Sequence, residues 1–83
     1  MKLVYFAWVR ERIGKPYEDV DLPAHVTTVT ELLSWLRSRG EEYEHALQHP
    51  KIIRVAIDQE HVGPAEPIAG AREIALFPPM TGG

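Results

Sequence analysis

The sequence predicts an α+β domain in which one mixed β-sheet is packed by one main helix and a short second helix. Strand-like hydrophobic segments lie toward both ends of the chain, and a strongly amphipathic helical segment lies between them. The length of 83 residues fits one domain. Two strands, a helical region and then further strands are typical of α+β folds.

The N-terminal part reads as two strands. Residues 3–9 are rich in β-branched and aromatic side chains and predict the first strand. Gly14 and Pro16 break the pattern that follows. Residues 17–22 alternate imperfectly between apolar and acidic side chains, so we expect a half-exposed partner strand there.

The clearest element is a helix that begins after Thr28. Thr28 and Glu31 have the spacing of a capping box, in which each side chain bonds to the other residue's free backbone N–H. Gly40 is expected to end the helix in a left-handed turn. One apolar stripe at helical spacing is formed by Val29, Leu32, Leu33 and Leu36.

The second half predicts a short helix and two strands joined by a loop-rich segment. Residues 41–49 read as the helix, and Pro50 follows it. Residues 51–58 read as a central strand, and residues 58–73 as mostly loop that has room for a very short strand at residues 61–62. Residues 72–77 form the last strand, which is hydrophobic and short and is expected in the middle of the sheet.

Composition excludes several classes of function. Nine basic and twelve acidic residues give a net charge of −3, which is no footprint for nucleic acid. No segment is long and apolar enough to span a membrane. The absence of cysteine excludes disulfides, cysteine-ligated metals and a thiol nucleophile, and fits a cytoplasmic protein.

No residue cluster predicts a self-contained active site. His45 and His49 have metal-ligand spacing on a helix, but a site needs a third ligand, so we predict no metal. The acidic run Glu41, Glu42 and Glu44 is explained by the positive end of a helix dipole. The glycines form no phosphate-binding motif.

The C-terminal tail, residues 78–83, has features that support one another. Pro78 and Pro79 donate no backbone hydrogen bonds, so the sheet must end there, and they favour an extended backbone. Gly82 and Gly83 then leave the backbone slim and the terminal carboxylate unhindered. Such a tail suits a tunnel in another protein, although a frayed terminus is the plain alternative.

The segment "LFPPMTGG" resembles the C-terminus of the MoaD family, the small subunits of molybdopterin synthase, which share the ubiquitin-like β-grasp fold. The segment that contains Phe6, Ala7, Arg10 and Glu11 is similar to the first strand of that family and the residues after it. The chain departs from the family at Asp58, where Asn is frequent, and at residues 70–73, where a Gly-Asp-Glu turn is frequent.

The resemblance implies a sulfur carrier for molybdenum cofactor synthesis, with a β-grasp domain over residues 1–77. An E1-like adenylating enzyme would activate the Gly83 carboxylate with ATP, and a sulfur donor would convert it to a thiocarboxylate. The chain would bind no cofactor tightly and would not be catalytic alone. It would donate sulfur to cyclic pyranopterin monophosphate as the small subunit of a heterotetrameric transferase. The residues expected to enter or contact partners are Phe77, Pro78, Pro79, Met80, Thr81 and Gly82.

Other functions fit the same sequence. A carrier for thiazole or thiouridine synthesis, or a ubiquitin-like modifier of lysines, would share the fold and the activation chemistry. A plain interaction domain with an incidental end is a further alternative. Phe77 lies on the strand face opposite to Ile74 and Leu76. It is either an exposed anchor for a partner or part of a second cluster with Leu3 or Tyr5.

Overall fold

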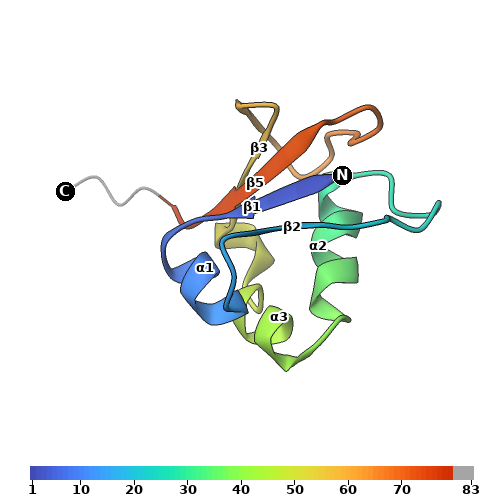
Figure 1. The fold of residues 1–83 in the computed structure, drawn as a ribbon. Helices are drawn as coiled ribbons and strands as arrows, with labels where there is room; N and C mark the ends of the chain where they lie inside the picture. Colours follow the sequence, from blue (N-terminus) through green and yellow to red (C-terminus); the bar gives the residue numbers. More distant parts are fainter. Residues whose placement is uncertain (80–83) are drawn as a thin grey trace.

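The computed structural model describes residues 1–79 and forms one five-stranded mixed sheet with the strand order β2-β1-β5-β3-β4. The helices lie on one side of this sheet (Figure 1). The elements in chain order are β1 (Lys2–Tyr5), α1 (Ala7–Ile13), β2 (Tyr17–Asp19), α2 (Val29–Arg37), α3 (Glu41–Ala46), a 3-10 helix η1 (Pro50–Ile52), β3 (Arg54–Ile57), β4 (Glu60–Val62) and β5 (Glu73–Phe77).

The last strand is central, as the sequence predicts. β5 lies between β1, to which it is parallel, and β3, to which it is antiparallel. The register pairs Tyr5 with Leu76 on one side and Val55 with Leu76 on the other. The first and last strands therefore lie side by side in the sheet, and the strand before the C-terminal tail is hydrogen-bonded on both edges.

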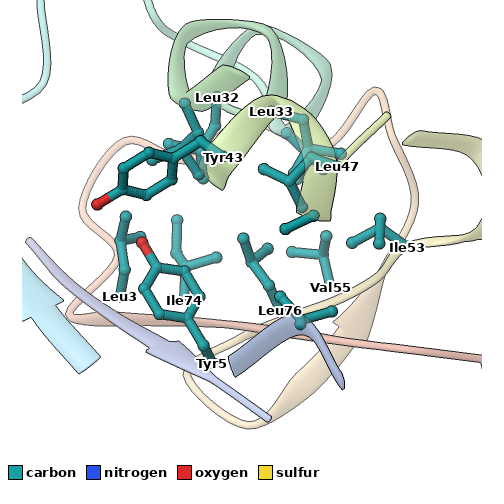
Figure 2. Close-up of a cluster of buried hydrophobic side chains, with 14 of the residues drawn as sticks. Leu3, Tyr5, Leu32, Leu33, Tyr43, Leu47, Ile53, Val55, Ile74 and Leu76 are labelled. Atoms are coloured by element: carbon teal, nitrogen blue, oxygen red, sulfur yellow. The ribbon is translucent and has the colours of Figure 1, made fainter. Parts of the chain in front are cut away.

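The core fills the space between the sheet and the helices, as Figure 2 shows. Ile74 and Leu76 of β5 are completely buried, which confirms that they share the covered face. The predicted stripe of α2 is buried as well. Large side chains with almost no exposed surface come from both the sheet and the helical side of the core: Leu3, Tyr5, Val9, Val29, Leu32, Leu36, Leu47, Ile74 and Leu76.

Helix α1 is absent from the sequence prediction, which extends the first strand to residue 9. The strand ends at Tyr5, because Ala7 adopts a left-handed backbone with φ of 51° that turns the chain away from the sheet. Val9 and Ile13 then bury one helical face, four residues apart. Gly14, with φ of 93°, ends the helix, and its N–H bonds to the Arg10 carbonyl. Residues 1–79 therefore contain three α-helices rather than the two that the sequence predicts.

Helix α2 begins as predicted but ends differently. The Thr28 side chain accepts a bond from the Glu31 N–H, and the Glu31 carboxylate accepts one from the Thr28 N–H, so the capping box is confirmed. The helix ends at Arg37 with Ser38 as its C-cap. Gly40 has an extended φ of 169° and instead precedes α3, so the prediction of a left-handed stop at Gly40 is wrong.

A largely buried carboxylate joins the β2 edge of the sheet to the helices. The Glu18 side chain on β2 is 11% exposed and accepts bonds from the hydroxyls of Tyr5 at 2.7 Å and Tyr43 at 2.6 Å. The Arg39 guanidinium donates to the same carboxylate at 3.0 Å, and the Lys15 ammonium lies 3.6 Å away. The two tyrosines belong to the core cluster of Figure 2, so Glu18 joins β1, β2 and α3 at one point.

This environment holds the carboxylate in its charged form. Burial is the largest single effect and raises the pKa of Glu18, but the bonds from Tyr43, Tyr5 and Arg39 together outweigh it and lower the pKa below its usual range. Burial and the bond to Glu18 raise the pKa of the Tyr5 hydroxyl, which keeps its proton for donation.

We predict that Glu18→Gln lowers the free energy of unfolding by about 1–3 kcal/mol at pH 7, because two buried hydroxyls lose a charged acceptor. The folded pKa of Glu18 lies below the unfolded value of about 4.3. Its contribution is therefore complete above that value and is lost as the pH falls through the lower folded pKa. Urea titrations from pH 7 to pH 2 should show the gap between wild type and variant closing. Glu44→Gln, which removes an exposed partner of Arg37, is the control with a smaller effect. Equal losses in both variants would contradict the account.

Helix α1 generates a second prediction. A methyl group added at Gly14 or Gly63 would meet nothing within 4 Å, but only Gly14 has a left-handed backbone. Gly14→Ala should therefore lower the unfolding free energy by about 1–2 kcal/mol through backbone strain alone. Gly63→Ala should leave the free energy unchanged or raise it slightly. Thermal and urea denaturation of both variants measure the difference; similar stabilities would mean that Gly14 does not cap α1 as described.

Candidate functional site

The candidate site begins where β5 ends. Phe77 is the last residue of the strand, and Pro78 follows it directly, as expected for a residue that cannot continue the ladder. The Phe6 N–H bonds to the Leu76 carbonyl at 3.1 Å, so the turn between β1 and α1 lies against the end of β5. The chain therefore leaves the sheet from its central strand, beside the start of α1 (Figure 1).

Three ring-bearing residues lie at this end of the sheet. The bond from the Phe6 N–H to the Leu76 carbonyl places the Phe6 backbone at the end of β5, and the Phe6 side chain is 46% exposed. The ring of His61 on β4 meets the ring of Phe77 edge to face, with centroids 5.2 Å apart. We call Phe6, His61 and Phe77 the tail-side surface. An exposed apolar surface beside a chain exit offers a partner aromatic contacts of the kind that dominate interface energies.

The structure rejects one of the two predicted roles of Phe77. Leu3 and Tyr5 are buried on the covered face with Ile74 and Leu76, whereas Phe77 lies on the other face and is half-buried. A second cluster of Phe77 with Leu3 or Tyr5 is therefore excluded. The partner contact of Phe77 remains a prediction.

The backbone of Ala7 helps to present Phe6. A left-handed conformation is uncommon for a residue other than glycine and costs energy that the surrounding structure must supply. Here it lets the Arg10 N–H bond to the Phe6 carbonyl and start α1 at once. Arg10 and Glu11, which belong to the segment that is similar to the MoaD family, are exposed on α1.

The remaining predicted tail residues divide at the end of the described chain. Pro78 and Pro79 are partly exposed beyond the strand. The other predicted site residues, Met80, Thr81, Gly82 and the reactive Gly83, lie outside the described residues. The structure thus provides the platform from which the tail departs, and the chemical role of Gly83 is a prediction.

The other candidates from the sequence separate in space or have structural roles. Helix α3 ends at Ala46, so His45 and His49 do not share a helix face. Glu44 pairs with Arg37 at 2.9 Å. Within residues 1–79, no group of three or more acidic or histidine side chains could hold a metal ion. In the same range, no helix has the length and apolar character needed to cross a membrane.

Both departures from the family pattern lie at one sheet end. Asp58, with φ of 47°, stands in the turn between β3 and β4. Its carboxylate accepts bonds from the N–H groups of Arg72 at 3.0 Å and Glu73 at 2.9 Å. An Asn side-chain oxygen could accept the same bonds, so Asp58 has a structural role at the start of β5.

Sequence reasoning did not assign His61 or Phe6 to the site. Phe6 stood inside a segment expected to be a continuous strand, and His61 in a segment expected to be mostly loop. The pairing of β4 with β3 brings His61 opposite Ala56. Strand β3 lies between His61 on β4 and Phe77 on β5. Only the sheet order, which the sequence did not specify in full, reveals their proximity.

Comparison with known proteins agrees with this geometry. The model of the ThiS family matches residues 3–83. The chain is 31% identical over 83 residues to the molybdopterin synthase sulfur carrier subunit of Escherichia coli, covering 100% of this chain and 99% of the relative. The subunit of Caenorhabditis briggsae is also 31% identical, over 85 residues, with 100% and 96% covered.

Solved structures show the same fold. SAMP1 from Haloferax volcanii superimposes with a TM-score of 0.72 at 28% identity and covers 100% of this chain and 98% of that one. A putative molybdopterin converting factor subunit 1 from Pyrococcus furiosus gives a TM-score of 0.73 at 22% identity, with 94% of each chain covered, which supports the fold alone. The β-grasp prediction is therefore confirmed, and the chain belongs to the ThiS family of ubiquitin-like proteins, with molybdopterin synthase sulfur carrier subunits among its full-length relatives.

Proposed function

We propose that this chain is the sulfur carrier of molybdenum cofactor synthesis and the small subunit of a molybdopterin synthase. The observation that carries the proposal is the position of β5. The central strand of the sheet ends at Phe77 and leads directly into the Pro-Pro-Met-Thr-Gly-Gly tail. Relatives that match the chain over its whole length are named as sulfur carriers of that synthase.

The chemistry proposed for the tail proceeds in two activations. A carboxylate oxygen of Gly83 attacks the α-phosphorus of ATP on an adenylating enzyme, which forms an acyl-adenylate and releases pyrophosphate. Sulfur from a donor then displaces AMP and leaves a thiocarboxylate. This terminal group stores sulfur without any cysteine, which suits a chain that contains none.

The loaded tail then enters the large synthase subunit. Its sulfur forms a C–S bond to cyclic pyranopterin monophosphate in place of a C–O bond, and water then cleaves the resulting thioester, which returns the Gly83 carboxylate. Two loaded carriers supply the two sulfurs of one dithiolene. The acid, base and oxyanion donors for these steps come from the partner proteins, because transition-state charge must be met by groups fixed around the reacting atoms. We assign this chain three tasks: to carry the sulfur, to project the tail and to dock. We place the reaction in the cytoplasm, in a heterotetramer with two large subunits.

The tail-side surface fits the docking task. Phe6, His61 and Phe77 lie around the chain exit, so a partner that encloses the tail would cover them as well. The aromatic contacts would fix the start of the tail at the mouth of the tunnel and reduce the freedom that the tail loses on entry. Binding at this surface and insertion of the tail would therefore support each other.

A second function is favoured by one finding. SAMP1, the small archaeal modifier protein 1 of Haloferax volcanii, is similar in both sequence and fold over the full chain. In a modifier, the acyl group of the same Gly83 adenylate would pass to a lysine amine, which forms an isopeptide bond and releases AMP. A thiazole or thiouridine carrier would use the thiocarboxylate but pass its sulfur to a different acceptor.

We predict that deletion of Gly83 abolishes sulfur loading and leaves the fold intact. The intact chain, incubated with adenylating enzyme, ATP and a sulfur donor, should gain about 16 Da when sulfur replaces one carboxylate oxygen. The deletion variant should keep its mass, because the new terminal carboxylate is one residue too short for the activating site. Thermal midpoints should agree, since the described fold ends before this residue. A sulfur-loaded deletion variant would refute the role of Gly83.

Phe77 generates a separate prediction about docking. Phe77→Ala should weaken binding to the large subunit by roughly 2 kcal/mol or more if the ring is an anchor. Its cost in unfolding free energy should be well below the 3–5 kcal/mol of a fully buried phenylalanine, because the ring is only half-buried. Titration calorimetry and a thermal scan measure the two quantities. Ile52→Ala, at an exposed apolar residue of η1 outside the tail-side surface, is the matched control. A stability loss with binding unchanged would reject the anchor role.

A further inference from the structure

The face of the sheet that the helices leave uncovered carries an arginine beside the chain exit (Figure 1). Side chains alternate along a strand, and the paired residues Val55 and Leu76 are both buried on the covered face. The neighbouring pair of the same register, Arg54 on β3 and Phe77 on β5, therefore lies on the uncovered face. Adjacent strands are about 4.8 Å apart, and Pro78 follows Phe77 directly, so the Arg54 backbone lies one strand spacing from the start of the tail.

The surroundings of Arg54 offer its guanidinium no anion within residues 1–79. Arg54 is exposed and forms no ion pair with another residue of this range. Toward β4, the register that pairs Val55 with Val62 continues to Gly63, which has no side chain. Along β5, the nearest acidic residue on the same face is Glu73, four residues before the end of the strand, which is about 13 Å away at 3.3 Å per residue. The positive charge therefore faces whatever approaches this end of the sheet.

A protein that encloses the tail would cover Arg54 as well. The tail continues β5 directly, so a partner that surrounds Pro78 and Pro79 meets the sheet at Phe77 and at the residue paired with it. Removing a guanidinium from water costs free energy, which a well-placed anion offsets. A carboxylate suits this position best, because it accepts two parallel N–H bonds from the planar guanidinium.

We propose that the protein that encloses the tail presents an Asp or Glu carboxylate to Arg54 at the mouth of its tunnel. The inference rests on the proposed function, because it requires a partner that takes up the tail. Apolar contact with Phe77 does not distinguish partners by charge, whereas Arg54 disfavours a partner that has a basic residue at this position. Arg54 thus determines which proteins accept the tail and has no part in the chemistry at Gly83.

The test compares two exposed arginines near opposite ends of β5. Arg72 precedes the strand and, like Arg54, forms no ion pair within the described residues, so it is a matched control. Titration calorimetry measures the affinity of the full chain for the large synthase subunit. Arg54→Gln should weaken binding at least about tenfold, which corresponds to roughly 1.4 kcal/mol. Arg72→Gln removes the same charge away from the chain exit and should leave binding nearly unchanged.

Two further readouts separate a charge pair from lost packing. Arg54→Lys keeps the positive charge and should bind more tightly than Arg54→Gln, although it cannot form the same pair of parallel bonds. Raising the salt concentration should weaken binding of the intact chain more than binding of Arg54→Gln, because that variant has already lost the charged contact. Thermal midpoints close to that of the intact chain would show that the variants remain folded.

The outcomes distinguish this inference from the function on which it rests. If the intact chain binds the large subunit and both Gln variants bind equally well, the inference is wrong and the proposed function stands. Tighter binding of Arg54→Gln than of the intact chain would also overturn the inference, because it would place a cation at the mouth of the tunnel. If the intact chain itself does not bind the large subunit, the proposed function fails and the inference fails with it.

Discussion

The parallel pairing of β1 with β5 at the centre of the sheet is the constraint on which the rest of the structure depends. It brings the first and last strands together and fixes Leu3 beside Ile74 and Tyr5 beside Leu76. Side chains alternate along a strand, so a slip of one residue would move Ile74 and Leu76 out of the core and turn Phe77 into it. The same register therefore stabilises the core and leaves Phe77 at the chain exit. A tail that follows a central strand also starts from backbone that is hydrogen-bonded on both sides.

The other interactions protect this arrangement in a small domain with little hydrophobic surface to spare. The Glu18 carboxylate accepts hydrogen bonds from two core hydroxyls and from Arg39. These bonds hold the β2 edge of the sheet against α3. Asp58 holds the N–H groups that lead into β5 at the opposite end. The Glu18 cluster at the β2 edge and the Asp58 turn at the start of β5 thus both stabilise the pairing of β1 with β5. At the chain exit, the rings of His61 and Phe77 form an aromatic surface outside the core.

Much of this fold could be predicted from local patterns. The capping box of Thr28 and Glu31, the stripe of α2 and the central position of β5 each follow from a short range of residues. Helix α1 was missed because its start combines aromatic and β-branched residues, which favour a strand. The signals for it were present in the four-residue spacing of Val9 and Ile13 and in the following Gly14. These helix signals cover too few residues to outweigh the strand propensity of the segment. The turn at Ala7, which separates the strand from the helix, became evident only in the structure.

The candidate site, too, could be predicted only in part from the sequence. The tail was recognisable from its own residues, because proline and glycine have fixed backbone consequences. Phe6 and His61 could not be assigned to it, since their proximity to Phe77 arises from strand order across the sheet. β5 ends at Phe77 and Pro78 follows it directly, whereas residues 80–83 lie outside the described residues.

The central claim is that a sulfur carried by this chain is delivered inside molybdopterin synthase. The most direct measurement is a single-turnover reaction of the thiocarboxylated chain with the large subunit and cyclic pyranopterin monophosphate, followed by mass spectrometry of product and carrier. The account predicts molybdopterin, with two chains returned to the carboxylate form for each product formed. A loaded chain that binds the large subunit yet yields no molybdopterin, while passing its sulfur to a thiazole or thiouridine precursor, would contradict it.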